Sequence, residues 1–188
     1  MKRSTVVMTV SVMMLFLAAT VLAAGVNFSG TWLRDKDKSD PMMGRGPGGG
    51  GGGQRPGGGG GQRPGGGGRG MADAQITLIL KQTQNELSLT RKIVAGGEER
   101  PAIEQKFTLD GKENTNTSQR GELKSKSKWN KDTLVVEGTQ KMTTPNGEFE
   151  MEVKDEYSLS ADGKVLTVST TRTTPGGEQT SKQVYIKQ

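Results

Sequence analysis

The sequence predicts an all-β fold, an antiparallel up-and-down meander of about 8-9 strands that curls into a barrel or a strongly curved sheet. Three observations predict it. Apolar and polar residues alternate along short segments, glycine turns separate these segments, and no segment after the first 24 residues has helical periodicity. Because each strand has one apolar face and aromatic residues are few, a sheet that closes on its own apolar face buries the most surface.

The clearest signal is a β-hairpin between Thr133 and Leu159. Its second arm alternates strictly, with one face made of Phe149, Met151, Val153, Asp155, Tyr157 and Leu159. Asn146-Gly147 suits a two-residue type I′ turn, since both residues tolerate positive φ angles. With this pair at the tip, the expected cross-strand partners are Met142 with Met151, Val136 with Tyr157, Leu134 with Leu159, Lys141 with Glu152, and Gly138 with Asp155.

The remaining strands are expected at 28–33, 76–80, 87–94, 103–109, 123–129, 165–173 and 179–187, with a polar segment at 113–118. A two-residue loop at Asp162-Gly163 would set Leu159 against Leu166 and Tyr157 against Val168. Two registers stay open for the last strand. Either Val184 and Ile186 point inward, or Tyr185 does.

The first 24 residues have the features of a secretory signal peptide. Lys2-Arg3 forms the charged region, Val6 to Leu22 the apolar region, and Ala23-Ala24 the cleavage site. An uncleaved anchor is the alternative, because the apolar run approaches the roughly 20 residues that span a bilayer. We expect cleavage, an exported protein in the periplasm or outside the cell, no stable membrane span after cleavage, and a single β domain over 27–188.

Residues 41–71 interrupt that domain with a tract that holds 18 of the 29 glycines. We expect this tract to be disordered, because it has almost no apolar side chains to bury. Its arginines, Arg45, Arg55, Arg63 and Arg69, are candidates for contact with an anionic polymer or lipid. Without these four and the two basic residues of the leader, 20 basic residues balance 20 acidic ones. The foldable part is therefore neutral, which argues against a nucleic-acid partner.

The composition also argues against an enzyme. The chain has no cysteine and no histidine, which removes thiolate chemistry, His-based metal sites and the commonest general base. We therefore expect no catalytic residues, no metal and no cofactor. Asp155 is the one acid on the apolar face of its strand, and a desolvated carboxylate there could act as a base. The alternative is a structural Asp155 near the rim or beside a polar neighbour.

Five short motifs resemble those of small exported, lipocalin-like β-barrel proteins of bacteria, a largely uncharacterised family. They are Phe28-Ser29-Gly30-Thr31-Trp32, Asp110-Gly111-Lys112-Glu113, Lys126-Ser127-Lys128-Trp129, Asp132-Thr133-Leu134-Val135-Val136-Glu137 and Leu159-Ser160-Ala161-Asp162-Gly163-Lys164. The resemblance covers the chain after the leader except the glycine tract. It implies a lipocalin-like barrel whose closed end is plugged by Trp32 beneath a basic side chain from a late strand, with Lys187 and Arg172 as candidates.

Two functions follow as hypotheses. In the first, the barrel binds a small hydrophobic ligand, and the candidate interior residues are Trp32, Trp129, Leu134, Val136, Gln140, Met142, Phe149, Met151, Val153 and Tyr157. The same residues could instead fill a solid core. In the second, the protein is a structural or interaction protein of the cell envelope, and the Arg-bearing glycine tract makes the contacts.

Overall fold

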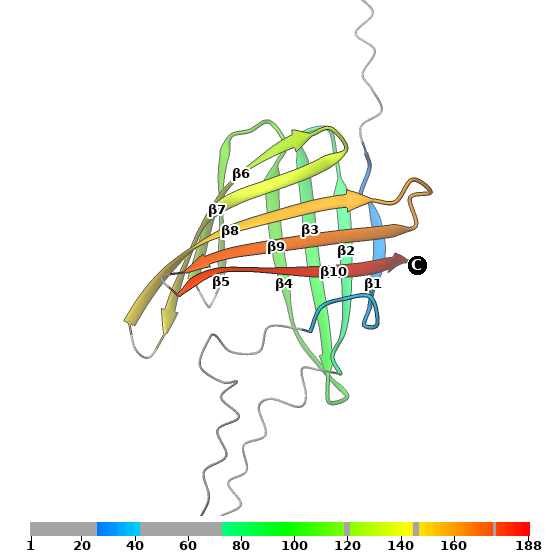
Figure 1. Cartoon of the computed structure of the whole chain (residues 1–188), viewed down its shortest axis with the longest axis horizontal. Helices are drawn as coiled ribbons and strands as arrows, with labels where there is room; N and C mark the ends of the chain where they lie inside the picture. The colour runs from blue at the N-terminus through cyan, green and yellow to red at the C-terminus, as the bar shows by residue number, and fades with distance from the viewer. Residues whose placement is uncertain (1–25, 42–72, 119–120, 145–146, 175) are drawn as a thin grey trace, which may run out of the picture.

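The computed structural model describes residues 26–41, 73–118, 121–144, 147–174 and 176–188. In these ranges the chain forms one antiparallel sheet in up-and-down order, which confirms the predicted fold class (Figure 1). The ten strands are β1 Gly30–Asp35, β2 Gln75–Gln82, β3 Glu86–Ala95, β4 Glu98–Thr108, β5 Glu113–Ser118, β6 Gly121–Asn130, β7 Thr133–Thr144, β8 Gly147–Leu159, β9 Val165–Thr174 and β10 Gly177–Lys187. The predicted signal peptide and most of the glycine tract lie outside the described residues.

Several strand bounds differ from the expected ones, and β4 begins at Glu98 instead of Ile103. β1 begins at Gly30 instead of Phe28, because Phe28 precedes the ladder and packs with its whole side chain inside the barrel. The polar segment at 113–118 is a strand of its own, β5. It has no apolar face, so hydrophobic alternation does not reveal it. The described residues therefore form ten strands where about 8-9 were expected.

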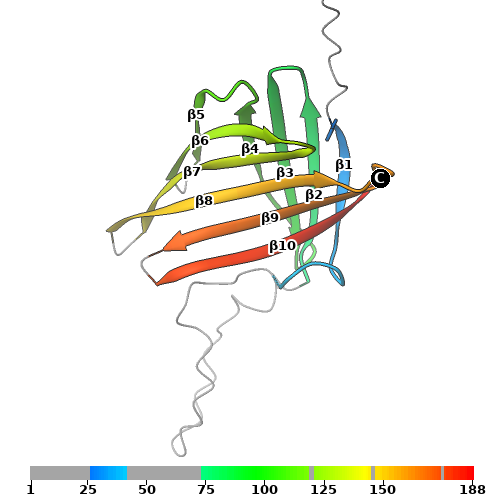
Figure 2. The ribbon, with the colours of Figure 1, turned by 45° about the horizontal axis from the view of Figure 1, so that its top comes forward.

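The sheet folds into two layers that cross steeply and form a nearly closed barrel (Figures 1 and 2). β1 to β4 make one layer and β6 to β10 the other, and β1 pairs with β10 to join them. Because neighbouring strands are antiparallel, successive turns alternate between the two ends of the barrel. The turns that follow even-numbered strands lie at one end, and the turns that follow odd-numbered strands lie at the other. The end with the β2–β3 and β8–β9 turns also holds Gln188, whose backbone N–H donates to Thr31 O at 2.9 Å.

This end is closed by a packed apolar core. Phe28, Trp32, Leu87, Phe107, Leu134 and Leu166 are each fully buried there. Phe28 stacks on Trp129 with 5.8 Å between the ring centroids and meets Tyr157 edge-on. Fully burying such side chains stabilises the fold by about 1.5–3 kcal/mol each. We call this the closed end, and the opposite one, where the β3–β4 and β7–β8 turns lie, the open end.

A glycine and a lysine explain the Gly-x-Trp motif at the closed end. Gly30 has a φ of 148°, and a Cβ at this position would lie 3.0 Å from Lys187 Cε. Without a side chain, Gly30 lets Lys187 Nζ lie 5.2 Å from the centre of the Trp32 ring, a cation–π contact. Trp32 Nε1 donates to Phe28 O at 2.9 Å. Of the two candidates for the basic partner, the structure thus selects Lys187.

The register of the β7–β8 hairpin differs from the prediction. Thr144 pairs with Gly147, and residues 145 and 146 lie outside the described residues. Met142 therefore faces Phe149, Val136 faces Asp155 and Leu134 faces Tyr157, and Lys141 forms its ion pair with Glu150 at 2.7 Å instead of with Glu152. The shift is two residues, so every side chain keeps its predicted face.

The β8–β9 register agrees with the prediction: Leu159 faces Leu166 and Tyr157 faces Val168. In β10, Tyr185 belongs to the apolar core, which settles the open alternative. Val184 is also buried, but outside that core, where its backbone N–H and C=O both bond Ser39 Oγ.

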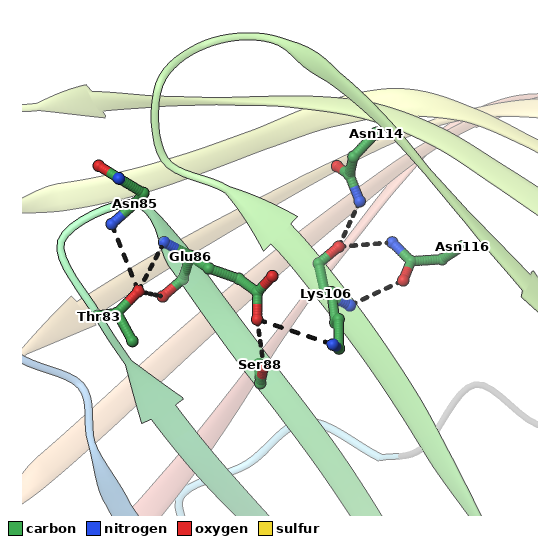
Figure 3. Close-up of polar contacts among 7 residues, drawn as sticks. All are labelled: Thr83, Asn85, Glu86, Ser88, Lys106, Asn114 and Asn116. Atoms are coloured by element: carbon green, nitrogen blue, oxygen red, sulfur yellow. Dashed lines mark hydrogen bonds and ion pairs between the residues drawn. The ribbon is translucent and has the colours of Figure 1, made fainter.

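The two edge strands, β4 and β5, meet without a strand ladder (Figure 3). Two asparagine side chains of β5 bond the backbone of Lys106 in β4 instead. Lys106 N–H donates to Asn116 Oδ1 at 2.7 Å, and Asn116 Nδ2 donates to Lys106 O at 2.8 Å. Asn114 Nδ2 donates to the same carbonyl. A side-chain amide offers an N–H donor and a C=O acceptor, as a backbone peptide group does. The amide of Asn116 can therefore take the place of a neighbouring strand's backbone and join β5 to β4 here.

Candidate ligand site

The predicted interior residues divide into two groups. Trp32, Leu134, Val136 and Tyr157 lie in the packed core, each at most 3% exposed, and Trp129 packs against it. In the core, these side chains pack against one another. This part of the barrel is the filled interior that the sequence allowed as an alternative.

The other five lie on the inner faces of β7 and β8 toward the open end, and all are partly buried: Gln140, Met142, Phe149, Met151 and Val153. Phe149 faces Met142 across the hairpin, and Met151 faces Gln140. The amide of Gln140 bonds two backbone carbonyls, so it presents little free polar surface. Together, these residues make an apolar wall, and we use that name for Met142, Phe149, Met151 and Val153.

Between the packed core and the apolar wall lies Asp155, which faces Val136 on β7 and Thr170 on β9 instead of the expected Gly138. Thr170 Oγ1 donates to Asp155 Oδ1 at 2.6 Å. Burial raises the pKa of the Asp155 carboxyl, while the Thr170 hydrogen bond and the charges of Arg91 and Arg172 act against this. The carboxylate is therefore a poorly solvated group with one hydrogen-bond donor.

Two tyrosines share these surroundings. Burial raises the pKa of the Tyr157 hydroxyl well above its ordinary value, and Asp155 raises it further. Burial also raises the pKa of Tyr185, while the Arg91 charge lowers it. The Arg91 charge thus lowers the pKa of the aspartate and of both tyrosines, Asp155 and Tyr157 alternate along the same face of β8, and Tyr157 and Tyr185 both belong to the core. We call Arg91, Asp155, Tyr157 and Tyr185 the interior polar cluster.

The two arginines nearest the core differ in their partners. Arg34 is buried and bonded: its Nε donates to Gln183 Oε1 at 2.6 Å and its Nη2 to Asp40 O at 2.8 Å. Arg91 Nε is buried and has no hydrogen-bond partner within the described residues. Ser127 Oγ is likewise buried and has no hydrogen-bond partner within the described residues. Sequence reasoning missed Arg91, although it continues the inward alternation of Leu87 and Leu89.

A hollow lies on the outside of the barrel. Its volume is about 690 Å³, and most of its lining consists of outward-facing residues of β6 to β9, among them Lys126, Glu137, Glu152 and Thr171. The lining is charged and mixed in sign, so it does not suit an apolar ligand. It is separate from the interior polar cluster.

The remaining predictions concern the arginines of the glycine tract, metal binding and a membrane span. Arg45, Arg55, Arg63 and Arg69 lie outside the described residues, so contact with an anionic polymer or lipid stays a prediction. Among the residues with described positions, no group of acids is arranged to hold a metal ion. No helix within the described ranges has the length and apolar character needed to cross a bilayer.

Comparison with known proteins is informative about the fold. No family model matches the chain, and no curated protein matches it. Among solved structures, it resembles the REP1-NXSQ fatty acid transporter with a TM-score of 0.50 and 11% identity over 86% of this chain and 96% of the other. Zebrafish ileal bile acid-binding protein complexed with cholic acid gives 0.49 and 13% over 86% and 98%. Secretory abundant heat soluble protein 4 from Ramazzottius varieornatus gives 0.48 and 14% over 86% and 94%.

The architecture, together with the likeness to the fatty acid transporter, defines the fold class: a nearly closed, lipocalin-like antiparallel β-barrel. At such low identity the likeness extends to the fold alone.

Proposed function

We propose that the protein is an exported, non-enzymatic binding module that holds a small apolar ligand in the open half of its barrel. One observation carries the proposal. Along β7 and β8, the inward side chains change from fully buried at the closed end to partly buried at the open end, where Met142, Phe149 and Met151 form one wall. Partly exposed apolar side chains that converge inside a barrel cost free energy in water, and a ligand removes that cost.

Two further points support it. A fatty acid transporter and a bile acid-binding protein share the barrel architecture, which is the expected architecture for such a role. The leader predicts export, and a carrier of poorly soluble molecules has a use outside the cytoplasm. The interior does not favour catalysis that depends on histidine or cysteine, because the chain has neither residue, and the Asp155 carboxylate is bonded to Thr170.

The test combines a search for cargo with a blocked variant. Native mass spectrometry of the protein purified gently from its own envelope fraction is expected to show a reproducible extra mass of a few hundred daltons that is lost on denaturation. Purified protein is expected to bind Nile red, a neutral apolar dye, with a blue-shifted emission.

Met151→Lys places a charge on the apolar wall and is expected to abolish dye binding. Glu152→Lys adds a positive charge one residue away on the outer face and serves as the matched control. A bare mass in every preparation, together with no dye uptake, overturns the proposal. Equal dye binding by wild type and Met151→Lys overturns the assignment of the wall.

A further inference from the structure

Arg91 occupies an unusual place for a charged residue. On the inner face of β3 it follows Leu87 and Leu89, and its two cross-strand neighbours are Leu78 on β2 and Ile103 on β4. Both neighbours are apolar, so neither side chain can accept a hydrogen bond. The buried Nε therefore has no acceptor on the side chains directly beside it.

The acceptors across the interior do not satisfy it. Asp155 is close enough for the Arg91 charge to lower the pKa of its carboxyl, yet no hydrogen bond or ion pair joins the two side chains in the described structure. The Asp155 carboxylate is bonded to Thr170 instead. A buried donor of this kind without a partner costs about 1–3 kcal/mol. A group that supplies an acceptor at this position removes the cost.

Charge and hydrogen bonding both favour an anion there. The positive charges of Arg91 and Arg172 lower the pKa of Asp155, and those of Arg91 and Arg34 lower the pKa of Tyr185. Asp155 adds a negative charge, which raises the pKa of Tyr185. The tyrosine hydroxyls are neutral at physiological pH, since burial raises the pKa of each. Neither hydroxyl makes a hydrogen bond within the described ranges, so both are available as donors.

We propose that the interior polar cluster binds the carboxylate of an amphipathic acid, with Arg91 as the charged partner and Tyr157 and Tyr185 as hydroxyl donors. The apolar part of the acid then extends over Met151 and its neighbours toward the open end. This inference rests on the proposed function and narrows it to a ligand class. A planar guanidinium matches a carboxylate better than a neutral head group, because it offers parallel charge-assisted donors.

The competing account is that water satisfies Arg91 and that the cluster only supports the fold. The two accounts differ in ligand preference. Decanoate and decanol have the same alkyl chain, so their affinities for the full-length mature protein, measured by displacement of Nile red at pH 8, isolate the head group. We expect decanoate to bind roughly 10- to 100-fold more tightly than decanol, the range expected for charge-assisted hydrogen bonds.

Variants locate the preference. Arg91→Met is expected to lose the preference for decanoate while it keeps the affinity for decanol. Lys92→Met, which removes a positive charge from the outer face of the same strand, is expected to keep the preference. Asp155→Asn is expected to strengthen decanoate binding alone, because it removes a negative charge beside the site.

The outcomes separate the two proposals. Equal affinity of wild type for decanoate and decanol overturns the carboxylate site and leaves the binding module standing. Failure to bind either ligand overturns both. If Arg91→Met does not fold, Arg91→Lys takes its place. The comparison of decanoate with decanol in the wild-type protein still decides on the carboxylate site, because it needs no variant. An unchanged preference in a folded Arg91→Met protein overturns the role of Arg91.

Discussion

Asn116→Ala is expected to open the seam between β4 and β5 at one identifiable amide. The substitution removes the acceptor of Lys106 N–H and one of the two donors to Lys106 O. Each such hydrogen bond contributes about 0.5–1.5 kcal/mol net. Because both are exposed to solvent, the lower end of the range applies, and we expect a loss of about 1 kcal/mol in the free energy of unfolding.

Hydrogen exchange measures the effect locally. Lys106 N–H is expected to exchange faster in Asn116→Ala, while amides of the β2–β3 ladder keep their wild-type rates. Asn116→Asp retains an oxygen acceptor and is expected to retain most of the protection. Asn85→Ala is the matched control, because the side-chain amide of Asn85 makes no hydrogen bond in the described structure (Figure 3). An unchanged exchange rate at Lys106 in Asn116→Ala would refute the reasoning.

Three more substitutions test other parts of the barrel. Lys187→Met removes the cation above Trp32 but keeps its aliphatic stem, so urea unfolding should show a loss of about 0.5–1 kcal/mol, and an unchanged midpoint would contradict the contact. Gly138→Ala should cost at least about 2 kcal/mol in the same assay, since a Cβ there would lie 2.0 Å from Lys124 O; wild-type stability would show that the strands can part. Asp155→Asn should be more stable than wild type at pH 7 but not at pH 3. Burial raises the pKa of Asp155 in the folded protein above its ordinary value of 3.8. The wild-type protein therefore loses stability as the pH rises from 3.8 through the pKa of the folded state, and the asparagine of the variant does not titrate. A variant that is less stable than wild type at pH 7 would contradict this reasoning.

The sequence predicted the strands well because their periodicity is direct. The second arm of the hairpin alternates so strictly that the inward face of β8 follows from it, and the Leu159–Leu166 pair follows from the Asp162-Gly163 turn. The hairpin tip was harder. Asn-Gly suits a type I′ turn, but Thr144 pairs with Gly147, and the two registers place the same residues on the same faces. Hydrophobic alternation has a period of two, so it cannot distinguish registers two residues apart.

Closure of the barrel could not be predicted from apolar patterns. β5 consists of polar residues, and its contribution depends on which side-chain amides meet the Lys106 backbone. Nothing in the local sequence around Asn114 and Asn116 identifies Lys106 as their partner, since the pairing is set by how far the sheet has curled. The strand and the seam become visible only when the ten strands are placed in space.

The candidate site was predictable in part. The apolar wall follows from alternation in β7 and β8, whereas the interior polar cluster combines residues from β3, β8 and β10. Arg91 stands in an otherwise apolar inward row, and that exception in the pattern was the available signal. Its significance depends on having Leu78 and Ile103 beside it, and cross-strand partners come from the register.

Tyr157 belongs both to the packed core and to the interior polar cluster, so in the proposed carrier one side chain would serve both stability and binding. Its ring is held edge-on to Phe28 at the closed end, which fixes where its hydroxyl lies. A donor fixed by core packing needs little ordering when a ligand arrives, so less binding free energy is lost to immobilisation. In the proposed carrier, the packed closed end would therefore contribute to recognition, because its core holds the ring of a tyrosine whose hydroxyl binds the ligand.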